Sequence, residues 1–254
     1  MAGKRYRRPV KRSSGPRPDA RTRAQAASIA ILVGGDLLAH RLGGRTGSAA
    51  VRLGAATAML GIARMAGVSW AELGLGREDL GSGARFGAAA AACAAGTVLA
   101  GVVVPGTRSM FLDERAVGHH CSPGVRLASI TLAAVPAEEL AYRSALLGLW
   151  LGTGRRRAMV WSSVLFGLSH VSATLSTMSQ TAIGGHLAER PLRQAAFVGG
   201  NVAVTGLAGA GFAWLRLRSG SVLAPVLAHA ALNDAALLAA SVVHASVPRH
   251  TEAV

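Results

Sequence analysis

Residues 194–215 read QAAFVGGNVAVTGLAGAGFAWL and contain no Asp, Glu, Lys or Arg. A helix rises about 1.5 Å per residue, so roughly 20 residues cross the ~30 Å hydrocarbon core of a bilayer. Residues 86–107 and 159–188 also lack these four residue types. The chain is 51% hydrophobic and 15% charged, whereas soluble domains are about 25% charged. The sequence therefore predicts an all-α, multi-spanning transmembrane helix bundle and not a soluble Ala/Gly-rich protein.

About seven spans are expected, each an apolar stretch bounded by polar residues. They are 24–39, 53–68, 86–104, 124–151, 159–178, 194–215 and 221–243. Four regions follow: a basic disordered cytoplasmic tail (1–23), N-terminal transmembrane helices and loops (24–123), a transmembrane core (124–243) and a C-terminal tail (244–254). The polar residues described below place an active site among the last four spans.

Positive charge is concentrated where a membrane protein would carry it. The net charge is +15, and nine Lys and Arg residues fall within the first 23 positions. Basic segments remain in the cytoplasm and attract anionic lipid. Because the chain changes sides at each span, residues 155–157, after the fourth span, are expected on the same side as the N-terminus. Arg216 and Arg218, after the sixth span, are expected on that side too. We therefore expect the lipid bilayer as a partner and no nucleic acid.

The two cysteines and the neighbouring histidines indicate neither a disulfide bond nor a metal site. Cys93 lies in an apolar stretch and Cys121 in a loop, so a disulfide between them is not expected. His119 and His120 precede Cys121, and we interpret this trio as incidental, because tetrahedral zinc takes ligands that converge from several elements.

Ionisable residues inside a span are costly and usually face a partner or a cavity. Residues 138–143 read EELAYR within the fourth predicted span. Glu139 and Arg143 are four residues apart, so they share a helix face and can form an ion pair. Glu138 shares its face with Tyr142, which leaves its carboxylate free to act as a general base.

Two further spans carry histidines. Residues 166–170 read FGLSH and residues 229–233 read HAALN. His229 and Asn233 are four apart and can point at one spot. The depths of Glu138, His170 and His229 agree within roughly 8 Å, so one shared site is geometrically possible. Asp36, in the first span, is either a hydrogen-bond partner within the bundle or a helix-end residue.

These motifs resemble the CPBP intramembrane proteases, the type II CAAX prenyl endopeptidase group. That family has Glu-Glu-x-x-x-Arg, then Phe-x-x-x-His, then His-x-x-x-Asn or Asp. In this sequence the matching residues are Glu138, Glu139, Arg143, Phe166, His170, His229 and Asn233. Residues 219–225 (SGSVLAP) and 70–76 (WAELGLG) also resemble family segments. The resemblance covers about residues 124–243, which it makes the catalytic core.

The resemblance implies peptide-bond hydrolysis within the membrane. By this carry-over Glu138 activates the water, and His170 holds the water or a metal ion. His229 and Asn233 orient the water and stabilise the oxyanion. Glu139 and Arg143 brace the site.

Whether a metal takes part is left open by the sequence. Glu138, His170 and His229 form a plausible zinc ligand set with an open fourth position. The same residues could also work with water alone. Family naming favours a metalloendopeptidase.

Two other functions are weighed. A non-catalytic immunity or scaffold protein could keep the family fold, and it is the alternative to an endopeptidase acting on a membrane-embedded or lipidated peptide or protein. A transporter ranks last, because the sequence shows no two related halves. The composition suggests a bacterial plasma membrane.

Overall fold

The computed structural model describes residues 18–42, 45–112, 123–178 and 190–246. Within these ranges every regular element is a helix and no strand is present, and residues 66–76 form turns and irregular structure. Residues 1–17 of the N-terminal tail, the trio at residues 119–121 and most of the C-terminal tail lie outside the described residues, whereas residues 18–23, predicted to belong to the disordered tail, are helical. The long helices are α1 (Pro18–Leu42), α2 (Arg45–Met65), α3 (Leu80–Val103), α9 (Arg155–Leu168), α10 (His170–Thr177), α12 (Pro191–Ser219) and α13 (Leu223–Ala245).

A further helical segment, continuous from residue 123 to 153, changes pitch along its length. Its parts are α6 (Pro123–Ser129), the π-helix η3 (Ile130–Ala134), α7 (Val135–Glu139), the π-helix η4 (Leu140–Leu146), α8 (Leu147–Trp150) and the 3₁₀ turn η5 (Leu151–Thr153). Short turns flank α3: η1 (Arg77–Asp79), α4 (Pro105–Arg108) and η2 (Ser109–Phe111).

Four described helices are long and apolar enough to cross a membrane. They are Arg77–Val103, Arg155–Thr177, Pro191–Ser219 and Leu223–Ala245. They correspond to the third, fifth, sixth and seventh predicted spans, which supports an integral membrane protein. The stretches 24–39 and 124–151, and residues 53–65 of the stretch 53–68, lie in helices that are not among these four, so the total of seven spans stays a prediction.

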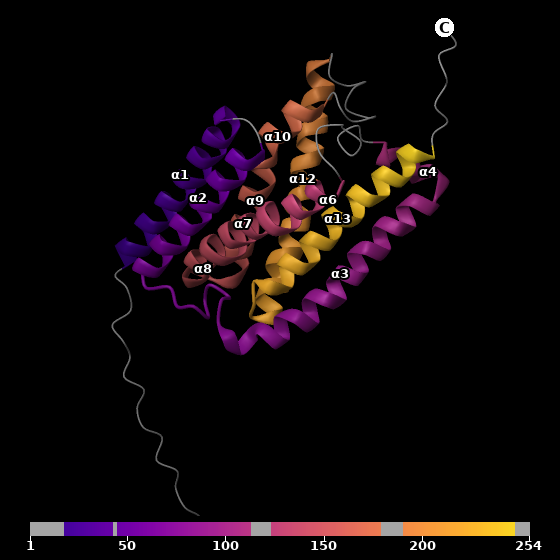
Figure 1. Ribbon diagram of the computed structural model, residues 1–254. Coiled ribbons are helices and arrows are strands. Elements are labelled where there is room, and N and C mark those ends of the chain that lie inside the picture. Colours follow the sequence, from indigo (N-terminus) through magenta and orange to yellow (C-terminus); the bar gives the residue numbers. More distant parts are fainter. Residues whose placement is uncertain (1–17, 43–44, 113–122, 179–189, 247–254) are drawn as a thin grey trace, which may run out of the picture.

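The helices pack in pairs around the 123–153 segment. In Figure 1, α1 and α2 lie together on one side, and α3 and α13 on the other. α3 and α13 run parallel, because Gly83 lies against Ser221 at one end and Arg108 donates to Ser246 at the other. α9 and α12 run antiparallel and approach closely: a Cβ on Gly167 would lie 2.6 Å from the Val202 carbonyl oxygen.

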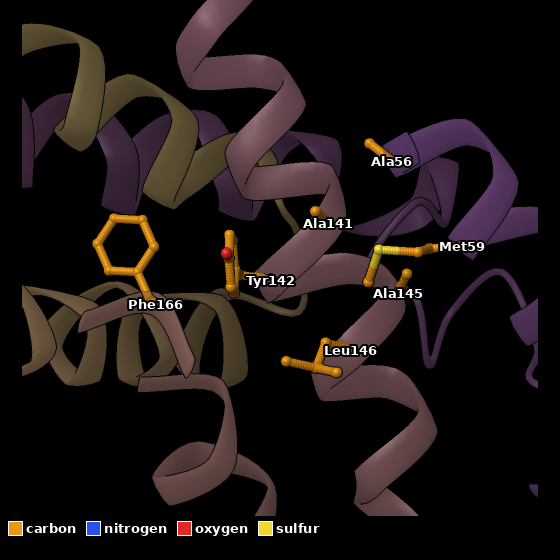
Figure 2. Close-up of a cluster of buried hydrophobic side chains, with 7 residues drawn as sticks. All are labelled: Ala56, Met59, Ala141, Tyr142, Ala145, Leu146 and Phe166. Atoms are coloured by element: carbon orange, nitrogen blue, oxygen red, sulfur yellow. The ribbon is translucent and has the colours of Figure 1, made fainter. Parts of the chain in front are cut away.

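One cluster of buried hydrophobic side chains lies where α2 meets the 123–153 segment. Figure 2 shows Ala56 and Met59 of α2 facing Ala141 and Ala145. Small residues at this contact let the two helices approach. On the other side of the same segment, the Tyr142 ring is directed toward Phe166 of α9. The middle of the segment, residues 135–149, is therefore enclosed on both sides, which explains how it buries polar residues, whereas Val125 and Leu132 before it are exposed.

The loop between α2 and α3 is anchored to the end of α12. Arg216 is 3% exposed and donates hydrogen bonds to the carbonyl oxygens of Ala71 and Glu72, at 3.1 and 2.9 Å. Arg155, at the start of α9, donates to the carbonyl oxygen of Leu217. The loop after α2, the start of α9 and the end of α12, which the predicted span order assigns to one side of the membrane, thus lie together. That this side is the cytoplasmic one stays a prediction.

The same loop holds the beginning of α1. Arg21 forms a 3.1 Å ion pair with Glu72, and the Glu72 carboxylate also accepts the backbone N–H of Ser69. Burial opposes ionisation of Glu72, but the hydrogen bonds from Ser69 and Arg21 outweigh it and lower the pKa of this carboxyl.

Candidate active site

Pro136 shapes the helix that carries both glutamates. Proline has no N–H to donate, so it interrupts the regular hydrogen bonding of a helix around it. The π-helix η3 ends just before Pro136, and a second π-helix, η4, begins directly after Glu139. π stretches inside α-helices are frequent at functional sites. Glu138 and Glu139 thus lie in a short α turn between two irregular ones.

Glu139 and Arg143 form the predicted ion pair. Arg143 Nη1 lies 3.2 Å from Glu139 Oε1, and neither side chain is exposed. The Arg143 guanidinium is also centred 3.9 Å from the Phe166 ring centroid and 5.3 Å from that of Phe212. Aromatic faces attract a cation, more strongly where water is excluded. With the Tyr142 ring centroid at 5.8 Å, one carboxylate and three rings therefore surround this buried positive charge.

His229 joins this pair from α13. Its Nδ1 lies 2.9 Å from Glu139 Oε1, and its ring stacks on Phe212 at 4.8 Å. An ionised carboxylate only accepts hydrogen bonds, so Nδ1 donates this one, and the tautomer that this bond favours has its lone pair on Nε2. The hydrogen bond thereby fixes both the tautomer and the orientation of the imidazole.

His170, the first residue of α10, is held in a similar way by the end of α9. Its Nδ1 lies 2.8 Å from the carbonyl oxygen of Phe166, which can only accept, so Nδ1 donates and Nε2 again bears the lone pair. The Phe166 ring contacts His170 at 4.7 Å and His229 at 5.9 Å between centroids. Phe166 also meets Tyr142 at 5.2 Å. The second and third sequence motifs thus meet at Phe166.

Glu138 lies in a hollow beside this cluster. The hollow is lined by Leu32, Gly35, Asp36, Arg52, Ala55, Ala137, Glu138, Ala141, Tyr142 and Ser169. Tyr142 and Ser169 connect it to the histidine cluster, since Tyr142 contacts Phe166 and Ser169 precedes His170. Glu138 is thus near the histidines, but no hydrogen bond joins it to them among the described residues.

The expectation that the Glu138 carboxylate has no ion pair is wrong. Arg52 of α2 places Nη1 3.3 Å from Glu138 Oε1 and Nη2 3.5 Å from Asp36 Oδ1. Ser172 donates to the other oxygen of Asp36 at 2.9 Å. The pairing was missed because Arg52 and Glu138 are far apart in sequence and meet only through packing. Asp36 is a hydrogen-bond partner within the bundle, the first of its two interpretations.

Replacing Arg52 tests this bridge. Arg52→Gln leaves Asp36 and Glu138 facing each other with no cation between them, so we expect a lower melting temperature. The Arg52 side chain is 37% exposed, and solvent screens partly exposed pairs, so a double-mutant cycle with Asp36→Asn should give a coupling of about 0.5–1 kcal/mol. Additive effects in thermal unfolding of the detergent-solubilised protein would contradict the bridge.

The C-terminal end of the third motif is half-buried. Asn233 lies one turn along α13 from His229 and makes no hydrogen bond within the described part of the chain. Its neighbour Asp234, which sequence reasoning missed, accepts a 2.6 Å hydrogen bond from Thr131, while its Oδ1 is buried without a partner. Asp234 could have been identified as a site residue from the sequence, because it is an ionisable residue next to Asn233 within an apolar span.

A metal ion needs several converging donors. The lone pairs on Nε2 of His170 and His229 suit a metal chemically. Among residues 18–42, 45–112, 123–178 and 190–246, however, no group of three His, Cys, Asp or Glu side chains is arranged to hold one. The donor types fit and their arrangement does not, so the zinc set stays a prediction and no step below depends on it.

Together these observations define an integral membrane protein with a buried acid–histidine site. Residues 122–234 match the family model described as type II CAAX prenyl endopeptidase Rce1-like. The match includes all three motifs, so the resemblance seen in them is confirmed over this segment, and the family that it resembles is one of endopeptidases. No curated protein and no solved structure matches the chain.

Proposed function

We propose that the protein is an intramembrane endopeptidase that hydrolyses a peptide bond of a membrane-associated or lipidated substrate. The observation that carries the proposal is the meeting of His170 and His229 around Phe166, beside the hollow that contains Glu138. The family match supplies the reaction class.

Each polar side chain of the site would have one role in peptide-bond hydrolysis. Glu138 would take a proton from a water molecule in the hollow, which makes that water a nucleophile. An imidazole Nε2 with a lone pair accepts a hydrogen bond from water, so His170 and His229 would orient it. The Asn233 amide N–H₂ is a donor and would stabilise the oxyanion of the tetrahedral intermediate.

Glu139 and Arg143 act through His229. Glu139 would accept a hydrogen bond from Nδ1 of His229, and Arg143 would hold the same carboxylate in place through its ion pair. Both are positioning residues in this scheme. Arg52 would have to release Glu138, or hold it in place, when a substrate enters.

Glu138→Gln tests the proposal. The amide keeps the shape of the side chain but is not a base, so cleavage should fall by about 10²–10⁴-fold. The measurement is a mass-spectrometric comparison of peptide termini in membranes of cells that express the native or the variant protein. Glu78→Gln is the matched control, because Glu78 lies in the turn η1 outside the site. Cleavage products that persist in Glu138→Gln would contradict the proposal and favour a non-catalytic role.

A further inference from the structure

A basic hollow lies between the start of α9 and the end of α12, away from the acid–histidine site. Its lining residues are Arg155, Arg156, Met159, Trp214, Leu217 and Arg218. No carboxylate lines it, and the three arginines are exposed. The hydrogen bond from Arg155 to the Leu217 carbonyl oxygen, 3.0 Å long, joins the two helix ends beneath it. Three clustered guanidinium groups with no carboxylate among them form a surface that favours binding of an anion.

The hollow sits at the level of lipid headgroups. α9 begins the candidate span Arg155–Thr177, and α12 ends the candidate span Pro191–Ser219. Both ends that form the hollow are therefore at one membrane surface. Trp214 is 55% exposed beside them, and tryptophan is enriched at the membrane–water interface.

An apolar groove continues from the hollow along the same two helices. Its lining residues are Met159, Val160, Ser163, Val164, Leu168, Val202, Ala203, Gly206, Leu207 and Ala210. Met159 lines both the hollow and the groove. From residue 159 to 168 the groove extends about 14 Å along α9. That length is close to half of the ~30 Å hydrocarbon core, which is the depth of one leaflet.

We propose that this surface binds one anionic phospholipid, with its phosphate against Arg155, Arg156 and Arg218 and an acyl chain in the groove. A free phosphate would use only the hollow. A zwitterionic lipid would bring its own cation to three arginines. Basic pockets between transmembrane helices suit anionic headgroups for this reason. The site does not depend on proteolysis, and such a lipid would fasten α9, which carries Phe166, to α12.

The test compares the removal of single positive charges that line the hollow with the removal of one charge beside it. The full chain, purified in mild detergent, is titrated with phosphatidylglycerol or phosphatidylcholine and the bound lipid is counted by native mass spectrometry. Arg156→Gln and Arg218→Gln should each weaken phosphatidylglycerol binding about fivefold. Arg157→Gln is the matched control, because it removes the same charge next to the hollow without lining it. Equal weakening by Arg156→Gln and Arg157→Gln would overturn the proposal, as would equal affinity for both lipids.

A second pair of variants tests the acyl chain. Val164→Trp should fill the groove and weaken phosphatidylglycerol binding, whereas Leu99→Trp, at an exposed apolar position on α3, should leave it unchanged. Inorganic phosphate is the competitor. Full displacement of the lipid by millimolar phosphate, together with no effect of Val164→Trp, would show that the hollow takes a free anion and would overturn the lipid assignment. Unchanged melting temperatures exclude misfolding as the cause of a loss.

Discussion

Glu139→Leu should destabilise the protein by about 3–5 kcal/mol, the cost of leaving a buried charge without its partner. Glu139 and Arg143 are both completely buried, and Glu139 also accepts the Nδ1 proton of His229. One substitution thus removes the carboxylate that is paired with a buried cation and that accepts the hydrogen bond of a buried histidine. We expect most of the variant to be unfolded after purification in detergent.

The aromatic rings cannot replace the carboxylate. A desolvated cation–π contact contributes about 2 kcal/mol, while burying an uncompensated charge costs several. Arg143 Nε, Nη1 and Nη2 have no hydrogen-bond partner in the described structure. The guanidinium is therefore held by charge and ring contacts alone, and its stability depends on Glu139.

Removing both charges is the control. Replacing a buried ion pair by apolar residues of similar volume is often neutral, so Glu139→Leu combined with Arg143→Met should recover most of the lost stability. Thermal unfolding followed by tryptophan fluorescence measures both variants. A single variant as stable as the native protein, or a double variant less stable than the single one, would contradict this reading of the pair.

The double variant also separates folding from the proposed chemistry. Without Glu139 the His229 Nδ1 proton has no acceptor, so the ring loses its fixed tautomer and orientation. Stability should return while cleavage stays low. Recovery of both together would mean that Glu139 has only a structural role.

Residues close in sequence were the predictable part of the site. The Glu139–Arg143 pair follows from helical spacing alone. Long apolar stretches predicted the four span-like helices because composition and length are sufficient there. The helices at 24–39 and 53–68 carry Ala and Gly, which are only marginally apolar, and so hydropathy gave a weaker basis for those spans.

Contacts between distant segments could not be predicted. His229 bonds Glu139, and Arg52 bonds Glu138, only because α13 and α2 pack on opposite sides of the 123–153 segment. Helical spacing assigns residues to faces but does not say which helix covers each face. Two π-helices flank the turn that carries Glu138 and Glu139. Their pitch differs from that of an α-helix, so the faces and depths calculated for a regular α-helix do not apply directly to the two glutamates.

Gly74→Ala is the other substitution with a large expected effect, on the order of 3 kcal/mol. Gly74 has φ +71°, a left-handed conformation that costs other residues about 1–2 kcal/mol. A Cβ there would also lie 1.9 Å from Arg216 Nε. Arg216 would have to move, and its bonds to Ala71 and Glu72 would be lost or weakened. Hydrogen bonds from a charged donor contribute about 1.5–3 kcal/mol each.

The loss should reach beyond the loop, because Gly74 is connected to the core on two sides. Its carbonyl oxygen accepts the Val222 N–H at 2.9 Å, and that of Leu73 accepts the buried Ser144 hydroxyl. A shifted loop would disturb the start of α13, which carries His229, and η4, which carries Arg143. Gly81→Ala is the matched control: it adds the same methyl group early in α3 with nothing within 4 Å. Melting temperatures that agree between the two variants would show that neither the backbone conformation nor Arg216 matters at this position.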